Sequence, residues 1–187
     1  MNFLLLGLAL FFLIFLVMVF GQIILSLMTI GFFYGPYYVG SDQIRIKNIL
    51  SLAKLTKNDH LIDLGTGDGR IVIAAAQTGA RATGIEINPI YYCRARHALK
   101  KHHLSPPQAQ VIWGDFWEKD LSAYSVVVVY GIGYIMSRLA KKLQKELKPG
   151  TKVISVYFKF PDWQMLKQKG DIRYYQIPDS LPKKPIN

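Results

Sequence analysis

The sequence predicts an α/β fold with a doubly wound, mostly parallel sheet, preceded by one transmembrane helix. Three observations lead to this prediction. No charged side chain occurs before Asp42, although the rest of the chain is rich in charge. Beyond Asp42, short apolar runs of strand length alternate with stretches of helical spacing, which is typical of a parallel sheet covered by helices. A glycine-rich turn at residues 63–69 separates the first such strand from the next helix, the place where open α/β sheets bind ligands.

The N-terminal segment is almost wholly apolar from Phe3 to Phe33. A spanning helix needs roughly 20 apolar residues to cross ~30 Å of hydrocarbon, and this run is longer. A cleaved signal peptide would have a basic start and a small-residue cleavage site, and neither is present. A buried core helix would not be apolar on every face. We therefore assign residues 1–34 to a single-pass transmembrane anchor, with Pro36 ending the helix.

The distribution of charge indicates where the folded part lies. Basic residues follow the anchor closely, whereas none precedes it, and the positive-inside tendency then places the domain that follows in the cytoplasm. The single cysteine, Cys93, fits a reducing compartment. The net charge of +11 is compatible with nucleic acid or with anionic lipid. Because the basic residues are dispersed and no nucleic-acid module is recognisable, we expect the lipid bilayer as a partner, and nucleic acid is disfavoured.

The remaining elements follow one another regularly. A linker at residues 35–43 leads into a folded domain at residues 44–177, and residues 178–187 form an irregular tail. Alternation along the domain favours right-handed crossovers and hence a doubly wound sheet. The apolar patterns predict strands at 60–64, 82–87, 110–113, 125–130, 152–160 and 172–177, and helices at 44–56, 70–78, 89–103, 134–147 and 161–168.

The turn from Asp63 to Gly69 is the most informative stretch. Glycines here let the backbone approach a ligand closely and adopt positive φ. A dinucleotide fingerprint requires Gly-x-Gly-x-x-Gly, but position 70 is Arg70, so that pattern fails by one place. A carboxylate at Asp63 suits a cationic amino group better than a pyrophosphate.

Two further acids stand after strands. Glu86 closes the second strand, where a carboxylate can accept two hydrogen bonds from a ribose diol. Asp115 follows the third strand and can accept a hydrogen bond from an adenine amino group, with Phe116 or Ile87 beside the ring. Taken alone, Asp115 could equally be a turn or cap residue.

Together these positions resemble the class I S-adenosylmethionine-dependent methyltransferases, which have a Rossmann-like fold. The shared features are Asp-x-Gly-x-Gly-x-Gly at 63–69, an acid after each of the next two strands, and Leu-Lys-Pro-Gly at 147–150. The resemblance implies S-adenosylmethionine as the cofactor of a methyltransferase domain at 44–177. The cofactor-binding residues that it implies are Asp63, Gly65, Thr66, Gly67, Gly69, Glu86, Ile87, Asp115 and Phe116.

A narrower resemblance covers nearly the whole chain. The sequence is similar to the family of adenine nucleotide translocase and ATP synthase c-subunit lysine methyltransferases, which also carry an N-terminal hydrophobic segment. The segments that carry this similarity are 36–39, 63–72, 84–89, 115–124, 142–150 and 160–163. The resemblance implies methylation of a lysine on a membrane protein.

The end of the fourth strand should hold the target group. The stretch from Tyr130 to Gly133 lacks the Asn/Asp-Pro-Pro-Tyr/Phe motif of nucleic-acid amino methyltransferases, and no cysteine follows it. We expect Tyr130 to line the catalytic pocket and orient the amine, with Trp163 and Tyr37 near its mouth. No metal is expected. A lipid or quinone methyltransferase and a cofactor-binding membrane protein without turnover are the alternatives.

Overall fold

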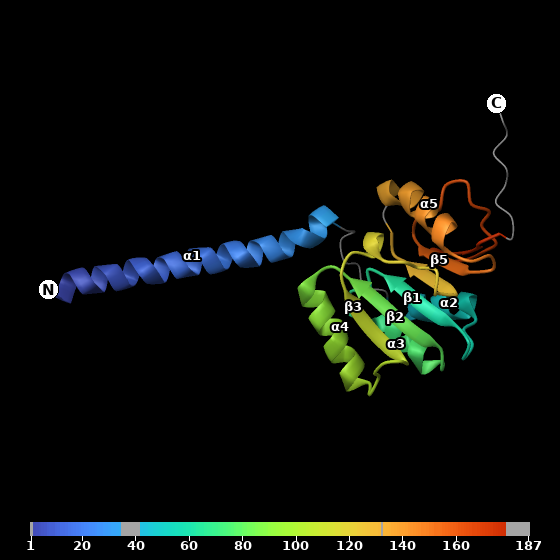
Figure 1. Ribbon diagram of the computed structural model, residues 1–187, viewed down its shortest axis with the longest axis horizontal. Helices are drawn as coiled ribbons and strands as arrows, with labels where there is room; N and C mark the ends of the chain where they lie inside the picture. The colour runs from blue at the N-terminus through green and yellow to red at the C-terminus, as the bar shows by residue number, and fades with distance from the viewer. Residues whose placement is uncertain (1, 35–41, 132, 179–187) are drawn as a thin grey trace, which may run out of the picture.

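The computed structural model describes residues 2–34, 42–131 and 133–178 (Figure 1). A long N-terminal helix is followed by a domain in which strands and helices alternate. The elements in chain order are α1 (Asn2–Tyr34), α2 (Gln43–Ala53), β1 (His60–Leu64), α3 (Arg70–Gln77), β2 (Arg81–Glu86), α4 (Pro89–Lys101), β3 (Ala109–Trp113), the 3-10 turn η1 (Phe116–Glu118), β4 (Val126–Val129), η2 (Gly133–Ile135), α5 (Met136–Glu146), β5 (Lys152–Val156), β6 (Lys167–Lys169) and β7 (Ile172–Gln176).

Within the described residues the strands form one seven-stranded sheet in the order β3-β2-β1-β4-β5-β7-β6. The first five strands in that order are parallel, and β7 runs antiparallel to both of its neighbours. The strand order reverses at β1, whose last residue Leu64 pairs with Ile85 of β2 and with Val129 of β4. The prediction of a doubly wound, mostly parallel sheet is confirmed, and the carboxyl ends of β1, β2 and β4 meet at one edge.

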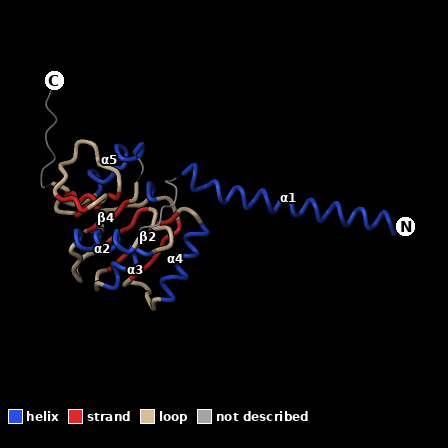
Figure 2. Tube along the Cα trace, turned by 180° about the vertical axis from the view of Figure 1, so that it is seen from behind, coloured by secondary structure: helices blue, strands red, loops and turns tan. Residues whose placement is uncertain are grey.

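Both faces of the sheet are covered, because alternate residues of each central strand face opposite layers. Leu61 of β1 packs into a core with α2, α3 and α4, the three helices on one side of the strands in Figure 2. The next residue, Ile62, packs into a second core with α5 and η1. Burial on both sides explains why β4 consists of valines alone.

The two ends of helix α2 are set by a side-chain cap at its start and by a left-handed residue after its last turn. Asp42 caps its first turn, and the Asp42 carboxylate accepts a hydrogen bond of 2.8 Å from the Arg45 backbone N–H. The helix ends at Lys54, which adopts a left-handed conformation with φ 44°. Helix α2 therefore stops before Thr56, earlier than its apolar spacing predicts.

The segment after β5 differs from the sequence prediction. Strand β5 ends at Val156 and not at Phe160, because Tyr157 takes φ 65° and turns the chain out of the sheet. The helix predicted at 161–168 is also wrong. Asp162 has φ 60°, and the chain then forms the short strand β6, joined to β7 through Gly170 at φ 61°. Three residues with left-handed backbone, which helical spacing cannot reveal, decide this region.

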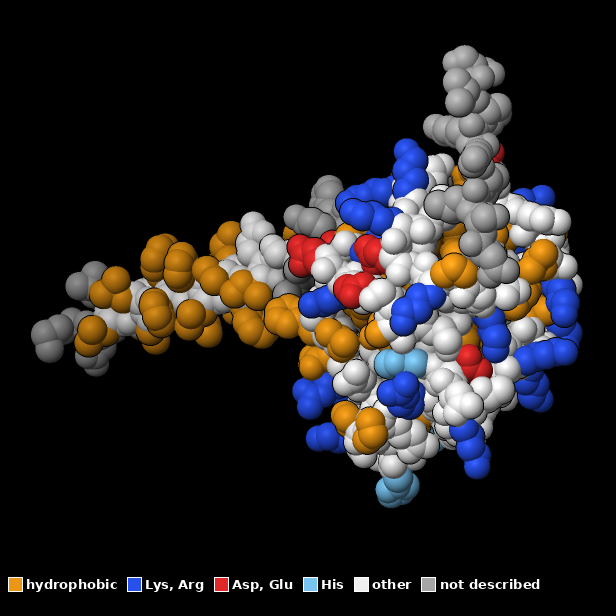
Figure 3. Space-filling view, turned by 45° about the vertical axis from the view of Figure 1, so that its right-hand side comes forward, with side chains coloured by type: hydrophobic (Ala, Val, Ile, Leu, Met, Phe, Trp, Pro, Cys, Tyr) orange, Lys and Arg blue, Asp and Glu red, His pale blue; other side chains and the backbone are white. Residues whose placement is uncertain are grey.

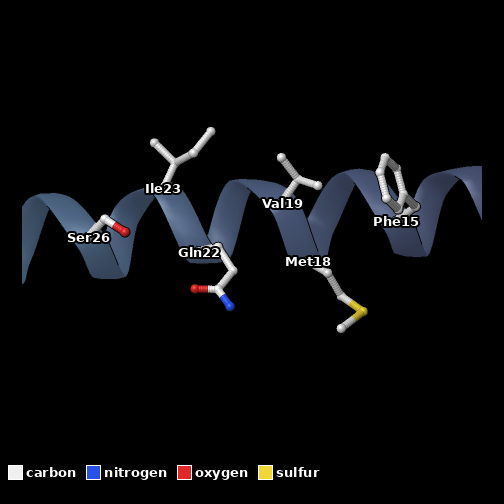
Figure 4. Close-up of a pocket in the computed structure, with 6 residues that line it drawn as sticks. All are labelled: Phe15, Met18, Val19, Gln22, Ile23 and Ser26. Atoms are coloured by element: carbon white, nitrogen blue, oxygen red, sulfur yellow. The ribbon is translucent and has the colours of Figure 1, made fainter.

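Helix α1 is apolar and its described side chains are exposed. The stretch Leu5–Ser26 is 22 residues long, its most apolar 18-residue window has a mean hydropathy of 2.9, and none of that window is buried against the rest of the protein. Figure 3 shows hydrophobic side chains covering it, whereas lysines and arginines are scattered over the domain. Figure 4 shows Gln22 and Ser26 among apolar neighbours along this helix. By length and composition α1 can cross a membrane; the predicted linker lies largely outside the described residues.

Candidate active site

The turn between β1 and α3 is fixed to β2 by its backbone. The N–H groups of Gly65 and Thr66 both donate to the carbonyl of Ile85 at 2.9 Å, and Gly69 donates to Thr66 at 3.0 Å. All three glycines of the turn have positive φ, between 58° and 81°. This backbone path is one that only glycine adopts without strain. The turn is therefore a rigid loop at the point where the strand order reverses.

Two of these glycines have distinct surroundings. Gly65 is exposed, and no described atom lies within 4 Å of the place where a Cβ would be. Its backbone is thus open to a ligand. At Gly69 a Cβ would meet the Cβ of Ala95 at 3.1 Å, because α3 starts in close contact with α4. The lack of a side chain at Gly69 therefore allows α3 to pack closely against α4, whereas at Gly65 it leaves the backbone open to a ligand.

Glu86 connects the turn to the end of β2. One carboxylate oxygen accepts a hydrogen bond from the Gly67 N–H at 2.8 Å, and the other accepts one from the Asn88 N–H at 2.8 Å. Burial raises the pKa of Glu86, and these backbone donors partly offset the rise. The sequence predicts that Glu86 binds a ribose diol. In the structure it also holds the glycine turn in place.

The side chain of Asp63 is buried and does not lie at the protein surface. Its side chain is only 2% exposed, beneath the turn that it begins. Burial raises the pKa of Asp63 to about 7; the Thr66 hydroxyl lowers it, and the charges of Glu86 and Asp68 raise it further. A positive charge placed nearby would favour the ionised form. The sequence-based prediction that Asp63 faces a cationic amino group stays a prediction.

The end of β3 contributes the third predicted subsite. Asp115 caps η1 by accepting a hydrogen bond from the Trp117 N–H at 2.9 Å. Ile87 is half-buried, and its carbonyl accepts a hydrogen bond from the indole of Trp113 at 3.0 Å. Phe116 is 8% exposed and belongs to the core, so only its edge is available to a ligand. Sequence reasoning gave no site role to Trp113, which is 61% exposed here.

Tyr130 follows β4 and lies beside the glycine turn, since Val129 pairs with Leu64. It is half-buried, and its ring meets that of Tyr157 edge-on with centroids 5.3 Å apart. Burial and the neighbouring Tyr157 raise the pKa of Tyr130, which therefore stays protonated at neutral pH. A protonated phenol can orient an amine, but it cannot act as a general base.

The remaining sequence predictions have mixed outcomes. Tyr37 lies outside the described residues. The ring of Trp163 stacks on that of Phe160, with the ring centroids 4.5 Å apart, and also packs against Tyr175. Both contacts are packing contacts. Within the described part of the chain, no three His, Cys, Asp or Glu side chains are grouped to hold a metal ion. The carboxylates and open backbone instead fit a cationic nucleoside such as S-adenosylmethionine.

Sequence reasoning missed a group beside Tyr130. The Nε of Arg45 donates to Asp171 at 2.8 Å, although the two residues are 126 positions apart. The same guanidinium donates to the hydroxyl of Tyr157 and lies over its ring. The only local signal for this group was the position of Arg45, three residues after Asp42, which caps α2.

The fold and the glycine turn define a methyltransferase of the class I type. The chain belongs to the family described as the ANTKMT methyltransferase domain, which matches residues 63–167, more than half of the chain. This confirms the family predicted from the sequence and, with it, the cofactor S-adenosylmethionine.

Particular relatives agree with this assignment. The chain is 38% identical over 129 residues to the ATP synthase c-subunit lysine N-methyltransferase of Xenopus laevis, covering 67% of this chain and 55% of that protein. It is 36% identical over 134 residues to a protein-lysine N-methyltransferase of Saccharolobus islandicus, covering 70% and 83%. The chain spans about half the length of the vertebrate c-subunit methyltransferases it matches.

A solved structure shares the domain closely. An RNA methyltransferase from Salinibacter ruber in complex with S-adenosyl-L-homocysteine has a TM-score of 0.72 and 34% identity, covering 80% of this chain and all of that one. That protein therefore carries the same fold with the demethylated cofactor bound.

Proposed function

We propose that this protein is a membrane-anchored, S-adenosylmethionine-dependent methyltransferase that methylates a lysine side chain of a membrane protein. The observation that carries the proposal is the rigid glycine turn joined to Glu86 in a chain whose relatives include protein-lysine N-methyltransferases. The sulfonium is an activated methyl donor, so the protein chiefly has to align the acceptor with it. Such alignment can supply about 7–11 kcal/mol of barrier reduction.

The donor residues have separate proposed roles. The exposed backbone at Gly65 accommodates the amino-acid part of the donor, with the buried Gly67 backbone behind it, while Asp63 supplies a negative charge beneath the turn. Glu86 accepts from the ribose hydroxyls through oxygens that the turn already fixes. Asp115 and Ile87 border the adenine, with the edge of Phe116 below; Thr66 and Gly69 complete the turn.

The acceptor side must present a neutral amine. With an ordinary lysine pKa of about 10.4, deprotonation at pH 7 costs about 4.6 kcal/mol. A half-buried environment such as that of Tyr130 reduces this cost by disfavouring the ammonium. Tyr130, being protonated, orients the amine and leaves the proton to solvent.

The way α1 is joined to the site supports the proposed placement at a membrane. The residues between α1 and α2, 35–42, can span at most about 29 Å when fully extended. Arg45, in the first turn of α2, contacts Asp171 and Tyr157 beside Tyr130. If α1 crosses a bilayer, the site end of the sheet stays close to its surface. The basic residues after α1 favour the cytoplasmic side.

The test is to incubate the full chain with labelled methyl donor and native membranes, then to separate protein, lipid and RNA. We expect label in protein, recovered as methyl-lysine after acid hydrolysis. Glu86→Ala should abolish labelling, whereas Glu118→Ala, which changes a carboxylate on η1 away from the turn, should not. Label confined to lipid would establish the lipid or quinone alternative. Label in RNA would exclude a lysine target, and donor binding with no transfer would indicate a protein without turnover.

A further inference from the structure

We infer that Tyr157 and Tyr130 together form the target-amine site, and that Arg45 is the positioning residue that holds Tyr157 there. This inference rests on the proposed methylation of an amine. It adds two residues, Tyr157 and Arg45, to which neither the sequence motifs nor the similarity to known proteins gives a role.

The strand register brings the two tyrosines to the donor. Val129 of β4 pairs with Ser155 of β5, so Tyr130 lies opposite Val156, and Tyr157 comes one residue further on. Both therefore emerge at the carboxyl edge where the glycine turn lies. Their rings stand edge-on at 5.3 Å with an interplanar angle of 67°. Two rings in edge-on contact form a corner against which a narrow, unbranched side chain such as that of lysine can lie.

The backbone of Tyr157 is strained, and its surroundings hold it in that state. Its φ of 65° is unusual for a residue with a bulky side chain. The Tyr157 N–H donates to the Asp171 carbonyl at 2.9 Å, and the Tyr157 carbonyl accepts from the Arg173 guanidinium at 2.6 Å. Packing does not require a tyrosine here, since it is 40% exposed. Strained residues that several contacts over-determine are typical of functional sites.

Arg45 fixes the Tyr157 side chain. Its guanidinium donates to the Tyr157 hydroxyl, and the guanidinium carbon lies 5.0 Å from the ring centroid. Arg45 is in turn paired with Asp171 at 2.8 Å and Asp42 at 2.9 Å. Because two carboxylates neutralise the guanidinium, it can orient the ring without repelling a cationic target.

The aromatic pair acts on the charge that develops during transfer. The lone pair of the amine nitrogen forms the new bond to the methyl carbon while the carbon–sulfur bond breaks. The electron pair of that bond goes to sulfur and leaves a neutral thioether. The nitrogen becomes an ammonium, which loses its proton to water. Aromatic faces attract the positive charge that passes to nitrogen, so the pair favours the transition state over the neutral amine.

The test compares Tyr157 variants in the full chain, with a lysine-containing membrane target and with S-adenosylhomocysteine. Tyr157→Gly removes the ring and also relieves the backbone strain, so a folding defect is not expected. We expect kcat/KM for the target to fall at least tenfold, with the Kd for S-adenosylhomocysteine within twofold of wild type. Tyr157→Phe should restore most of the activity. Tyr134→Ala, at a 76% exposed tyrosine, is the matched control and should have no effect.

Arg45 is tested by a double-mutant cycle. Arg45→Met should raise the KM for the target more than it lowers kcat, and it should have little further effect in the Tyr157→Gly background. Full activity in Tyr157→Gly, an equal loss of donor affinity, or additive effects with Arg45→Met would overturn the inference. A wild-type chain that binds donor but labels no protein would overturn the proposed function as well, whereas labelled protein with unchanged Tyr157→Gly kinetics would overturn the inference alone.

Discussion

The two halves of the site are built in different ways. The proposed donor half comprises the turn at 63–69, Glu86 and Ile87, with Asp115 and Phe116 from the end of β3, and its turn is held by hydrogen bonds from backbone N–H groups to Ile85 and Glu86. The acceptor half draws Arg45, Tyr130, Tyr157 and Asp171 from four separate segments and is held by their side chains. Backbone contacts tolerate changes in sequence around them, whereas a side-chain network depends on every member. Donor binding should therefore be separable from target recognition.

The largest effect should come from the donor turn. Gly67→Ala places a side chain on a residue with φ 58° in a loop that donates to Glu86, so the loop must shift. We expect affinity for S-adenosylhomocysteine, measured by calorimetry, to fall by about two orders of magnitude, or roughly 2.7 kcal/mol. Gly170→Ala, at φ 61° in the β6–β7 turn, imposes comparable strain away from the donor half, and this variant should bind S-adenosylhomocysteine normally. Equal losses in both variants would mean that strain alone is responsible.

A second prediction separates the anchor from both halves. Deleting residues 1–34 should leave donor affinity nearly unchanged, because the described core clusters contain no residue of α1. Methylation of a membrane-embedded target should fall at least tenfold, since the anchor raises the effective concentration of target near the site. A soluble peptide carrying the same lysine should be methylated nearly as before. Equal losses on both substrates would show that α1 supports the site itself.

A third prediction uses the buried carboxyl of Asp63. Its folded-state pKa of about 7 exceeds its usual value, so the folded state binds the extra proton between about pH 4 and pH 7. The stability contribution of this group is therefore lost as pH rises through that window. Binding of a cationic donor should strengthen as pH rises towards 7, by up to about tenfold per pH unit, and level off above it. Asp63→Asn should flatten both profiles between pH 4 and pH 8; an unchanged slope would assign them to other groups.

The smallest effect should come from Trp113. Its indole N–H donates to the Ile87 carbonyl and so steadies the loop beside the proposed adenine subsite. Trp113→Phe removes one largely exposed hydrogen bond, worth about 0.5–1.5 kcal/mol, which corresponds to roughly a two- to tenfold loss of donor affinity. Target KM should not change, because the contact belongs to the donor half. A rise in target KM would show that the two halves are coupled.

The proposed donor half could be predicted from the sequence because its determinants are local. The spacing of Gly65, Gly67 and Gly69 after a buried strand, with Glu86 at the end of the next strand, is enough to identify a nucleoside-binding turn. The alternation of apolar runs likewise predicted each of the parallel strands. In both cases the residues that interact are close in sequence or repeat with a fixed period.

Tertiary structure alone decided the rest. The depth of Asp63 and Phe116 depends on which layers cover the sheet, and no local pattern records that depth. The end of β5 at Tyr157 and the short β6 depend on left-handed residues, and Tyr157 is held by contacts with Asp171 and Arg173. Arg45 meets Asp171 across 126 residues because α2 packs beside β5 and β7. Contacts of this kind arise only when the sheet is assembled. The sequence by itself therefore determined the glycine turn, whereas the assembled fold determined which side chains form the proposed acceptor half.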